Sequence, residues 1–545
     1  MSFLWWRDGV LYQIYPRSFM DANGDGVGDL RGIEQKLDHL AWLGVDGIWL
    51  SPCFPSPMAD FGYDVSDYCD IDPLFGDLAD FDSLLAAAHA RNLRVILDWV
   101  PGHTSDQHAW FQESRRSRDS AKRDWYVWRD PAAGGGPPNN WLSIFGGPAW
   151  EWDETTEQYY LHGFLVEQPD LNWRNPELVE AMHGVLRFWL DRGVDGFRID
   201  VIHRILKDPE LRSNPLRPGQ DERGGFGAQQ HLHDENHPDV HGALRDIRTL
   251  LDGYDERMMV GEVYLMDPDE MATYYGEGDE LHLAFNFPFL HSPWAADAFG
   301  GHADRMEQLL SGISGAWPTW TLSNHDHARH ITRYDDPSRP GARDARARLA
   351  ALLLLTLRGT PFLYYGEEIG MPNVTVPVER MQDPLAKTLH PNVSRDPERT
   401  PMQWEAGTGA GFTRGEPWLP LGDANACNVE AQRSEPHSLL HFYRDLIALR
   451  RETRDLHAGS FRRLRAPEGV LAFERGERAR IALNFTDAPQ TVQLGAGAVT
   501  GGVSTHPDRT LPSDGSQVIL APDEGIVLLK AGTVLGGRRG SEDAE

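Results

Sequence analysis

The chain has few cysteines, no long apolar run and no excess of basic residues. Its 545 residues include three cysteines, Cys53, Cys69 and Cys427, without paired spacing, which argues against a disulfide framework. The densest aliphatic run, Leu352–Leu357, is far too short to span a bilayer, so no membrane partner is expected. The N-terminus lacks the basic and apolar regions of a signal peptide, and the cytoplasm is the expected location.

The charge balance points away from nucleic acids. The chain carries 52 Lys and Arg against 82 Asp and Glu, a formal net charge of −30. Such a balance repels phosphate backbones and excludes nucleic acid as an expected partner, but it suits a neutral substrate such as a sugar. A chain of 545 residues is also too long for one ordinary core, so two or more domains are expected.

Short apolar strands alternate with amphipathic helices, which indicates βα units and a parallel sheet. Helices are predicted at Arg31–Leu43, Leu78–Arg91, Pro176–Arg192, Asp239–Asp252, His302–Ser314, Arg343–Leu357 and Glu435–Arg451. Strands are predicted at Val10–Tyr15, Gly47–Leu50, Arg94–Val100, Gly196–Asp200, Met258–Tyr264, His282–Phe287, Trp317–Leu322 and Pro361–Tyr365. The pattern therefore predicts an α/β fold, a (β/α)₈ TIM barrel.

Two connections are too long for ordinary loops and predict additions to the barrel. The first reads as an inserted domain after strand 3, and the second as an extended loop subdomain after strand 8. Both should emerge beside the site and wall it. Short alternating strands then predict a C-terminal antiparallel β-sandwich, followed by a polar, disordered tail. The predicted domains are 1–103 with 175–456 (barrel, including 370–434 as the loop subdomain), 104–174 (insertion), 457–534 (β domain) and 535–545 (tail).

Four of the predicted strands end in charged or polar side chains. In a (β/α)₈ barrel such groups converge at the carboxyl ends of the strands. Three carboxylates, two histidines and an arginine at one mouth suit cleavage of a glycosidic bond. The four segments are Asp98-Trp-Val-Pro-Gly-His103, Gly196-Phe-Arg-Ile-Asp200, Val260-Gly-Glu-Val-Tyr264 and Leu322-Ser-Asn-His-Asp326.

The chemistry of these side chains supports a reaction centre. Arg198 and Asp200 are two apart on a strand and face the same side, so the cation should hold the carboxylate ionised and able to attack an anomeric carbon. Glu262, at the end of another apolar strand, could have a raised pKa and donate a proton. Each group alone would more readily be structural, as a salt bridge or a buried acid. Their coincidence with Asp98 and Asp326 on further strands favours catalysis.

These segments resemble the diagnostic regions of the α-amylase family, glycoside hydrolase family 13, and the likeness runs over nearly the whole chain. Further segments resemble its oligo-1,6-glucosidase and α-glucosidase branch: Tyr12–Phe19, Asp60–Asp64, Gln168–Trp173, Gly359–Phe362 and Arg399–Trp404.

The resemblance implies a retaining, exo-acting α-glucosidase with some transglucosylation. Asp200 would be the nucleophile, Glu262 the acid/base and Asp326 the stabiliser of the transition state. Retention requires the two reacting carboxyl groups to stand roughly 5–5.5 Å apart. The resemblance also implies the residues that hold the sugar in the first subsite: Asp98, His103, Arg198 and His325.

Aromatic residues are expected around this subsite. Tyr63 could lie against the apolar face of the sugar, and Phe145 and Phe164, from the insertion, could flank the entrance. For the two phenylalanines the sequence allows core packing equally well.

The far end and the specificity of the pocket follow from similarity to the branch. Asp60 and Arg399 would pair and close the pocket behind a terminal glucose, with Gln168 also among the substrate-binding residues. Val201, after the nucleophile, goes with α-1,6 or other non-α-1,4 bonds. Relatives with this valine also act on trehalose or sucrose, which leaves open a glucosyl transferase or isomerase acting on sucrose, maltose or trehalose.

An alternative of another class is a non-catalytic carbohydrate-binding or transporter-associated homologue. The carboxylates and the lack of a predicted membrane helix disfavour it. The expected partner is a small oligosaccharide, and the expected state is a monomer or homodimer.

A nine-residue loop predicts a metal site. Oxygen ligands alternate around glycines from Asp21 to Asp29, as in the first part of an EF-hand-type loop, although Gly32 stands where the terminal glutamate would be. The alternative is a polar turn that caps the first helix. Because the branch commonly has one metal here, a structural Ca²⁺ or Mg²⁺ is expected, and no organic cofactor. The predicted ligands are Asp21, Asn23, Asp25, Val27 and Asp29.

Overall fold

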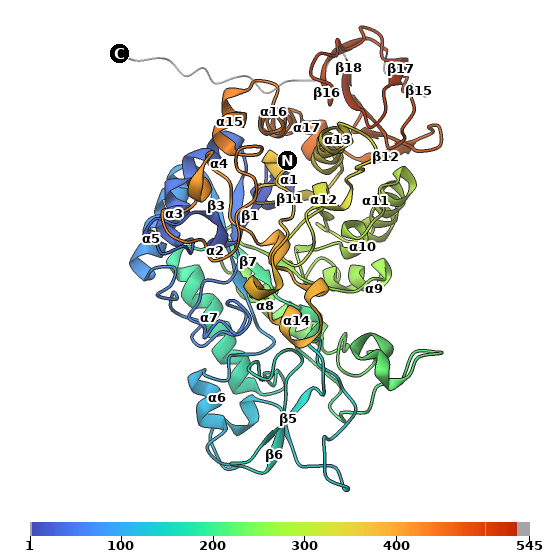
Figure 1. The fold of residues 1–545 in the computed structure, drawn as a ribbon. Helices are drawn as coiled ribbons and strands as arrows, with labels where there is room; N and C mark the ends of the chain where they lie inside the picture. Colours follow the sequence, from blue (N-terminus) through green and yellow to red (C-terminus); the bar gives the residue numbers. More distant parts are fainter. Residues whose placement is uncertain (1–2, 496, 531–545) are drawn as a thin grey trace.

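The computed structural model describes residues 3–495 and 497–530 and shows a barrel with an addition at each end (Figure 1). Within this part of the chain, eight parallel strands form one nearly closed sheet in the order β10, β11, β1, β2, β3, β7, β8 and β9. All eight predicted strands are confirmed, and the α/β barrel fold with them. The strands are β1 (Leu11–Ile14), β2 (Gly47–Leu50), β3 (Arg94–Trp99), β7 (Gly196–Ile199), β8 (Met258–Gly261), β9 (Leu283–Ala284), β10 (Thr319–Thr321) and β11 (Thr360–Tyr364).

Alternate side chains of these strands face the inside of the barrel. Leu11, Ile96 and Val260 belong to an apolar cluster that fills this interior, and each is at most 1% exposed. Two residues further along their strands, the same inward face carries Asp98 and Glu262. The strand period therefore places acids directly above a packed apolar floor, at the carboxyl ends of the strands.

Helices cover the outside of the barrel. They are α3 (Leu30–Gln35), α4 (Leu37–Leu43), α5 (Leu78–Ala90), α7 (Pro176–Arg192), α8 (Val240–Leu251), α11 (Ala296–Leu310), α13 (Ala342–Thr356) and α16 (Leu439–Glu452). The helix α7 has the predicted bounds for local reasons. Asn175 accepts hydrogen bonds from the first turn, Pro176 occupies the first position, and Gly193 ends the helix with φ of 107°.

Three helix predictions were wrong in detail. The predicted helix His302–Ser314 runs instead over Ala296–Leu310, because its buried apolar face already begins at Ala296 and Phe299. The predicted helix Arg31–Leu43 is divided in two at Lys36, whose φ of −104° and ψ of 3° are not helical. The apolar stripe shows which side chains are buried, and a single residue with non-helical backbone angles does not interrupt it. The predicted helix Glu435–Arg451 begins instead at Leu439, because Ser438 caps it, and a separate helix, α15 (Val429–Ser434), precedes it.

The insertion after β3 forms a small module of its own. Its antiparallel sheet has the order β4 (Trp128–Arg129), β6 (Gln158–Leu161) and β5 (Trp150–Asp153), and α6 (Ala109–Ser114) covers it. Phe111 stacks on Trp128 with ring centroids 5.6 Å apart and meets Tyr160 at 5.2 Å. These rings form a core separate from the barrel interior.

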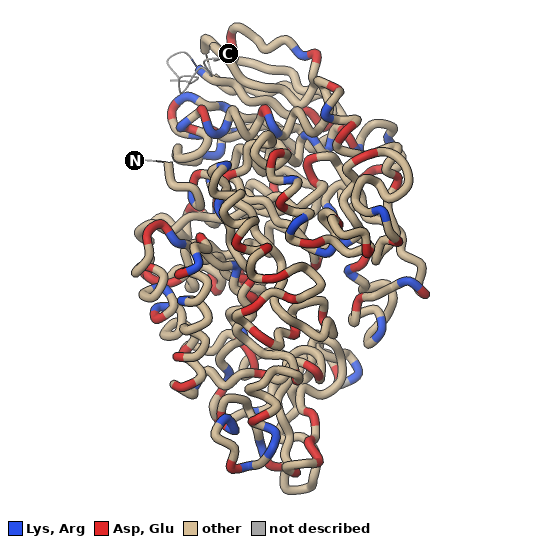
Figure 2. Tube along the Cα trace, turned by 90° about the vertical axis from the view of Figure 1, so that its left-hand side faces the viewer, with Lys and Arg blue, Asp and Glu red and all other residues tan. Residues whose placement is uncertain are grey.

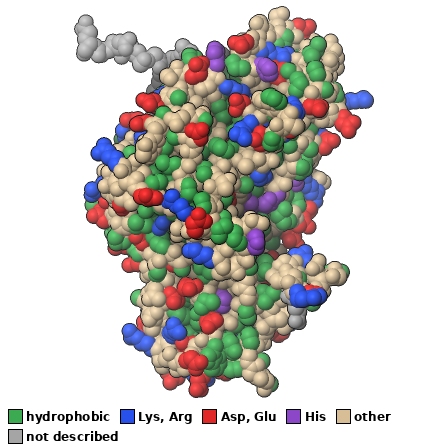
Figure 3. All heavy atoms as spheres, viewed as in Figure 1, with side chains coloured by type: hydrophobic (Ala, Val, Ile, Leu, Met, Phe, Trp, Pro, Cys, Tyr) green, Lys and Arg blue, Asp and Glu red, His purple; other side chains and the backbone are tan. Residues whose placement is uncertain are grey.

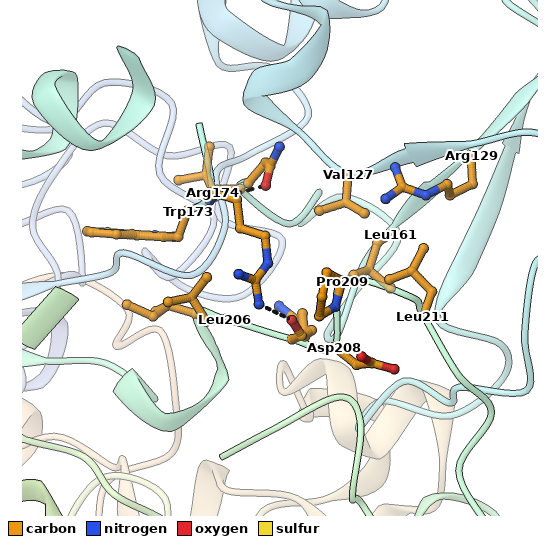
Figure 4. Close-up of a pocket in the computed structure, with 13 residues that line it drawn as sticks. Val127, Arg129, Leu161, Trp173, Arg174, Leu206, Asp208, Pro209 and Leu211 are labelled. Carbon is orange, nitrogen blue, oxygen red and sulfur yellow. Dashed lines mark hydrogen bonds between the residues drawn. The ribbon is translucent and has the colours of Figure 1, made fainter. Parts of the chain in front are cut away.

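A small cavity lies where the insertion meets the barrel (Figure 4). It measures about 50 Å³, and Val127, Trp173 and Pro209 contribute to its lining. Arg174 crosses this region and donates to the Lys207 carbonyl at 2.8 Å. The cavity is too small for a sugar and lies apart from the acids at the strand ends. It is a packing gap between the insertion and the barrel.

The C-terminal part is antiparallel and packs against α11 and α13. A five-stranded sheet runs in the order β12, β13, β14, β18 and β16, and β15 pairs with β17. The predicted tail 535–545, and residues 531–534 of the predicted β domain, lie outside the described residues. The strands are β12 (Phe461–Leu464), β13 (Val470–Arg475), β14 (Ala479–Asn484), β15 (Gln490–Gln493), β16 (Val499–Ser504), β17 (Gln517–Leu520) and β18 (Gly525–Lys530).

Acidic residues are interspersed with basic ones along the trace (Figure 2), and both lie among apolar side chains on the face drawn in Figure 3. One buried acid joins the C-terminal part to the barrel. Asp523, 1% exposed, accepts from Arg339 at 2.6 Å, from Trp294 at 3.3 Å and from Arg346 at 3.4 Å. Among the described residues, no helix is long and apolar enough to cross a bilayer.

Replacing Asp523 with alanine should lower the free energy of unfolding by about 2–4 kcal/mol, because two half-buried arginines would lose their shared carboxylate. Urea unfolding would measure the change. Asp487→Ala, which removes an exposed acid of the same domain, is the matched control and should stay within about 0.5 kcal/mol of the parent. Equal effects of the two substitutions would contradict the assigned role.

Candidate active site

The carboxyl ends of the strands bring the predicted acids into one pocket. Asp200 follows β7, Glu262 follows β8 and Asp326 follows β10, and all three line a cavity of about 100 Å³. Asp98, on β3, lies beside Arg198 in the register of β3 and β7. The convergence that the sequence predicted is therefore present.

A buried guanidinium connects three of these acids. Arg198 donates through Nη1 to Asp98 at 2.6 Å and to Asp200 at 2.8 Å, and through Nη2 to Glu262. Its side chain is 3% exposed. Because the two expected reacting carboxyls, Asp200 and Glu262, contact the same cation, they lie close together.

The pKa of Asp200 differs from the expectation that Arg198 simply keeps it ionised. Burial raises this pKa well above its ordinary value and the Glu262 charge adds to the rise, although Arg198 opposes both. Burial likewise raises the pKa of Asp98 to about 6 against the pull of Arg198. The physical reason is that one cation is divided among three buried carboxylates. Such a set retains a proton, which leaves one acid to donate and another to accept.

Asp326 lies in the opposite electrostatic environment. Burial alone would raise its pKa, but His325, Arg395 and Arg399 together hold it below its ordinary value. Arg399 donates to its Oδ1 at 2.7 Å and Arg395 at 3.1 Å. This carboxylate is therefore ionised at neutral pH.

Tyr63 forms part of the pocket wall together with two histidines. Its hydroxyl lies 3.0 Å from Asp98 Oδ2 and 2.6 Å from His325 Nε2, and its ring stacks on that of His325 at 5.5 Å and 7°. His103 contacts the Tyr63 carbonyl at 3.0 Å. Burial lowers the pKa of His103 to about 4, so its imidazole is neutral. The Gln168 amide nitrogen lies 3.1 Å from His103 Nε2.

The insertion supplies another wall. Phe145 and Phe164 both line the cavity, with ring centroids 6.3 Å apart, and Phe164 packs on His103 at 5.0 Å. Both rings therefore face the pocket, as expected for residues that flank its entrance. Whether they contact a sugar stays a prediction.

The predicted ion pair between Asp60 and Arg399 was wrong among the described residues. Asp60 pairs instead with Arg395, at 2.9 Å. Arg399 is engaged elsewhere, by Asp326 and by the His325 carbonyl at 2.7 Å. Arg395 also contacts Asp383 at 2.7 Å. The sequence reasoning missed Arg395 and Asp383; the signal was a second arginine four residues before Arg399, just outside the segment that carried the resemblance.

Val201 has a strained backbone. Its φ of 31° and ψ of 46° lie in the left-handed region, which β-branched residues rarely adopt. This turn ends β7 at Ile199, one residue earlier than predicted, and brings the Val201 amide to 3.3 Å from Glu262 Oε2. The strained residue thus follows Asp200 directly, and its amide contacts Glu262.

The small pocket opens into a wider cavity of about 640 Å³. The two share Phe164, Val201, Glu262 and Asp326. Tyr264, 40% exposed, lines the wider part. The site thus has a narrow part, lined by Asp60, and a roomy part, and Arg395 lines both.

The predicted metal loop has oxygen donors suited to a hard cation. Asp21 and Asp29 are buried, whereas Asn23 and Asp25 are exposed. Their carboxylate oxygens accept from backbone amides of the loop, with Asp21 bound to Gly26 N at 2.8 Å and Asp29 to Ala22 N at 2.9 Å. Asp29 also caps α3, as the alternative interpretation held.

In the described ranges, no three Asp, Glu, His or Cys side chains are grouped closely enough to hold a metal by themselves. A cation here would need the Asn23 amide oxygen and the Val27 carbonyl as further ligands. The residues present can supply both.

A family model matches most of the chain. The model of the alpha amylase catalytic domain matches residues 13–459. The chain belongs to the α-amylase family. It is thus a glycoside hydrolase, and the resemblance stated from the motifs is confirmed.

Several relatives of this glycoside hydrolase are similar over most of their length. A probable alpha-glucosidase of Rhizobium meliloti is 44% identical, over 90% of this chain and 91% of that protein. An oligo-1,6-glucosidase of Parageobacillus thermoglucosidasius is 41% identical, over 83% and 84% respectively.

Solved structures show the same similarity. The alpha-glucosyl transfer enzyme XgtA has a TM-score of 0.90 at 44% identity, over 97% of this chain and 100% of that one. The trehalulose synthase MutB has a TM-score of 0.88 at 34% identity, over 96% and 100%.

Replacing Arg395 with glutamine should move the acid limb of the kcat/KM profile to higher pH by roughly one unit, the effect of a nearby opposite charge. Burial raises the pKa of Asp60 to about 6, and Arg395 opposes that rise. Loss of the cation raises the pKa of Asp60 further, so this carboxylate of the pocket becomes protonated, and activity falls, at a higher pH. Arg414→Gln, at an exposed arginine of the same loop, is the matched control. An unchanged acid limb would contradict the proposed coupling.

Proposed function

We propose that this glycoside hydrolase is a retaining, exo-acting α-glucosidase that removes terminal α-glucose from short oligosaccharides. It would favour α-1,6 or other non-α-1,4 bonds and transfer part of the glucose to other sugars. The observation that carries the proposal is the contact of Asp200 and Glu262 with one guanidinium in a narrow pocket that Asp326 also lines.

The first step would use the two acids in opposite roles. The proton that the three buried carboxylates share would lie on Glu262 when the sugar is bound, which leaves Asp200 ionised. Glu262 donates this proton to the glycosidic oxygen, while Asp200 attacks the anomeric carbon and the bond to the leaving sugar breaks. The product is a glucosyl ester of Asp200. Removal of a proton from water by ionised Glu262 then allows attack on the ester, which releases α-glucose and restores both side chains.

Asp326 would stabilise the transition state between these steps. Its carboxylate is kept ionised by Arg395 and Arg399. A fixed negative charge favours the positively charged, oxocarbenium-like ring more than the resting sugar, which is differential binding.

The form of the cavity supports exo cleavage and transfer. The narrow pocket of about 100 Å³ is lined by the paired Asp60 and Arg395, and in this proposal the pair would block a longer chain. The outer cavity of about 640 Å³ has room for the leaving part of an oligosaccharide or for an acceptor sugar. An acceptor bound there would compete with water for the glucosyl ester.

Val201 supports the preference for non-α-1,4 bonds. It lines both cavities, beside Glu262, where the bond to be cleaved would lie. A second candidate function is isomerisation of sucrose, favoured by the structural similarity to a trehalulose synthase at 34% identity.

We also propose that the loop Asp21–Asp29 binds a structural Ca²⁺, with Mg²⁺ as the alternative ion. The loop packs against the segment after β11: Thr413 donates to Asp21, and the Asp21 amide donates to the Phe412 carbonyl at 3.0 Å. A cation would fasten this segment, which also carries Arg395 and Arg399.

The cytoplasm is the proposed location, and a monomer or homodimer the proposed state. All three cysteines lie in the described part of the chain and are free, which accords with a reducing compartment.

The proposed function is tested with maltose, isomaltose, trehalose and sucrose in parallel. We expect α-glucose as the first-formed anomer, fastest from isomaltose, with transfer products at high substrate concentration. A rearranged disaccharide as the main product would favour the isomerase instead, and β-glucose as the first product would contradict retention.

The Asp200→Asn variant should lose about four orders of magnitude in kcat with an unchanged melting temperature, because the amide cannot form the ester. Glu262→Gln should lose less with substrates whose leaving group needs no proton, such as 4-nitrophenyl α-glucoside. Near-normal hydrolysis by Asp200→Asn would refute the assignment.

Chelation of Ca²⁺ should lower the melting temperature by several degrees, because an ion that binds the folded state stabilises it by mass action. Asp25→Ala, at an exposed ligand position, should remove the difference between Ca²⁺ and chelator without impairing the fold. Identical melting in Ca²⁺ and in chelator for the parent chain would contradict the site.

A further inference from the structure

Gln13 lies in the barrel wall behind the pocket and is not part of the site described above. It is on β1 and 1% exposed. Its amide nitrogen lies 3.1 Å from Ser51 Oγ and 2.8 Å from His325 Nδ1. An amide nitrogen carries two hydrogens and accepts nothing, so Gln13 donates both bonds.

The hydrogen bonds on the other side of the His325 ring also place its single proton on Nε2. The Tyr63 hydroxyl has one proton and three partners: Arg198 Nη1, which donates to it at 3.4 Å, Asp98 Oδ2 at 3.0 Å and His325 Nε2 at 2.6 Å. The Asp98 carboxylate, which is paired with Arg198, accepts. Tyr63 therefore donates to Asp98, and His325 Nε2 donates to Tyr63. Asp326 Oδ2 lies 3.2 Å from the same nitrogen, and an ionised carboxylate there also favours a proton on Nε2.

The reversed arrangement sets two acceptors against each other. If the Gln13 oxygen faced His325, the ring would carry its proton on Nδ1 and Nε2 would be bare. The single Tyr63 proton could then serve only one of His325 and Asp98, and the other contact would have no proton between its two acceptors. Asp98 Oδ2 would still accept from Trp49 at 3.2 Å, so the penalty is this repulsion and not an unpaired carboxylate.

We propose that Gln13 is a positioning residue: it holds His325 in the tautomer whose Nε2–H faces the sugar pocket. The proposal rests on the function proposed for that pocket. Gln13 touches no substrate and acts through its bond to His325; its other bond goes to Ser51, which follows β2.

The charges around His325 make the tautomer matter. Burial lowers the pKa of His325 well below its ordinary value; Asp326 raises it, and Arg399, Arg198 and Arg395 lower it further. The ring is therefore neutral and has one proton to place. Which nitrogen carries that proton decides whether the pocket receives a donor or an acceptor.

Two substitutions of Gln13 separate this role from packing. Gln13→Met keeps the bulk but donates nothing, and kcat/KM should fall about 10- to 100-fold, the usual effect of losing an outer partner of a functional histidine. Gln13→Glu places an acceptor beside Nδ1, which takes up a proton. At low pH the ring is an imidazolium with a proton on each nitrogen, so Nε2–H still faces the pocket. At high pH the ring loses the Nε2 proton, because the new carboxylate of this variant holds the remaining proton on Nδ1. We expect a new alkaline limb in the pH profile of this variant.

Ser51→Ala is the matched control. It removes the other partner of the same amide in the same buried wall but leaves the bond to His325, so kcat/KM should stay within about twofold of the parent. Equal losses for Ser51→Ala and Gln13→Met would show that packing alone is at work and would overturn the proposal. A parental pH profile for Gln13→Glu would overturn it as well.

The tautomer of His325 can also be measured directly, without an activity assay. In protein labelled with ¹⁵N-histidine, the ring nitrogens of His325, assigned by their loss in His325→Asn, should show a protonated Nε2 and a bare Nδ1, and this pattern should change in Gln13→Glu. A protonated Nδ1 in the parent chain would overturn the proposal. If the parent protein cleaved no α-glucoside while the ¹⁵N pattern was as expected, the proposed function would fail and the tautomer assignment would stand.

Discussion

The pocket depends on one buried cation shared among three acids. Arg198 contacts Asp98, Asp200 and Glu262 and is almost completely shielded from solvent. Removing such a charge from water is costly, and the cost is offset because every guanidinium contact is a charge-assisted hydrogen bond. Since one positive charge cannot neutralise three carboxylates, the set holds a proton. This shortage of positive charge allows two chemically similar acids to take opposite tasks.

The fold provides the positions that this arrangement needs. The inward face of β3 and β8 carries Ile96 and Val260 at the floor and acids two residues later, so Asp98 lies on a regular strand and Glu262 directly after one. The loops add what strands cannot supply. The insertion contributes the two phenylalanines, and the segment after β11 contributes Arg395 and Arg399, which keep Asp326 ionised.

Much of this could be predicted from the sequence because strands and their last residues are local features. Each barrel strand is a short apolar run; Asp200 and Glu262 follow directly after one, and Asp326 lies in the turn after β10 (Thr319–Thr321). Features that depend on contacts between distant loops were missed or misassigned. Asp60 and Arg395 are 335 residues apart, and no local pattern distinguishes Arg395 from Arg399 as the partner. The left-handed backbone of Val201 and the break at Lys36 are single-residue events that periodicity does not register.

The central claim is that Asp200 becomes covalently bound to glucose in a pocket it shares with Glu262. The most direct measurement is mass spectrometry of peptides from the protein after reaction with 5-fluoro-α-glucosyl fluoride, which forms a slowly hydrolysed glucosyl ester. The account predicts one added fluoroglucosyl group on the peptide that contains Asp200. A label on the peptides of Glu262 or Asp326, or rapid turnover of the reagent with no ester formed in denatured samples, would contradict it.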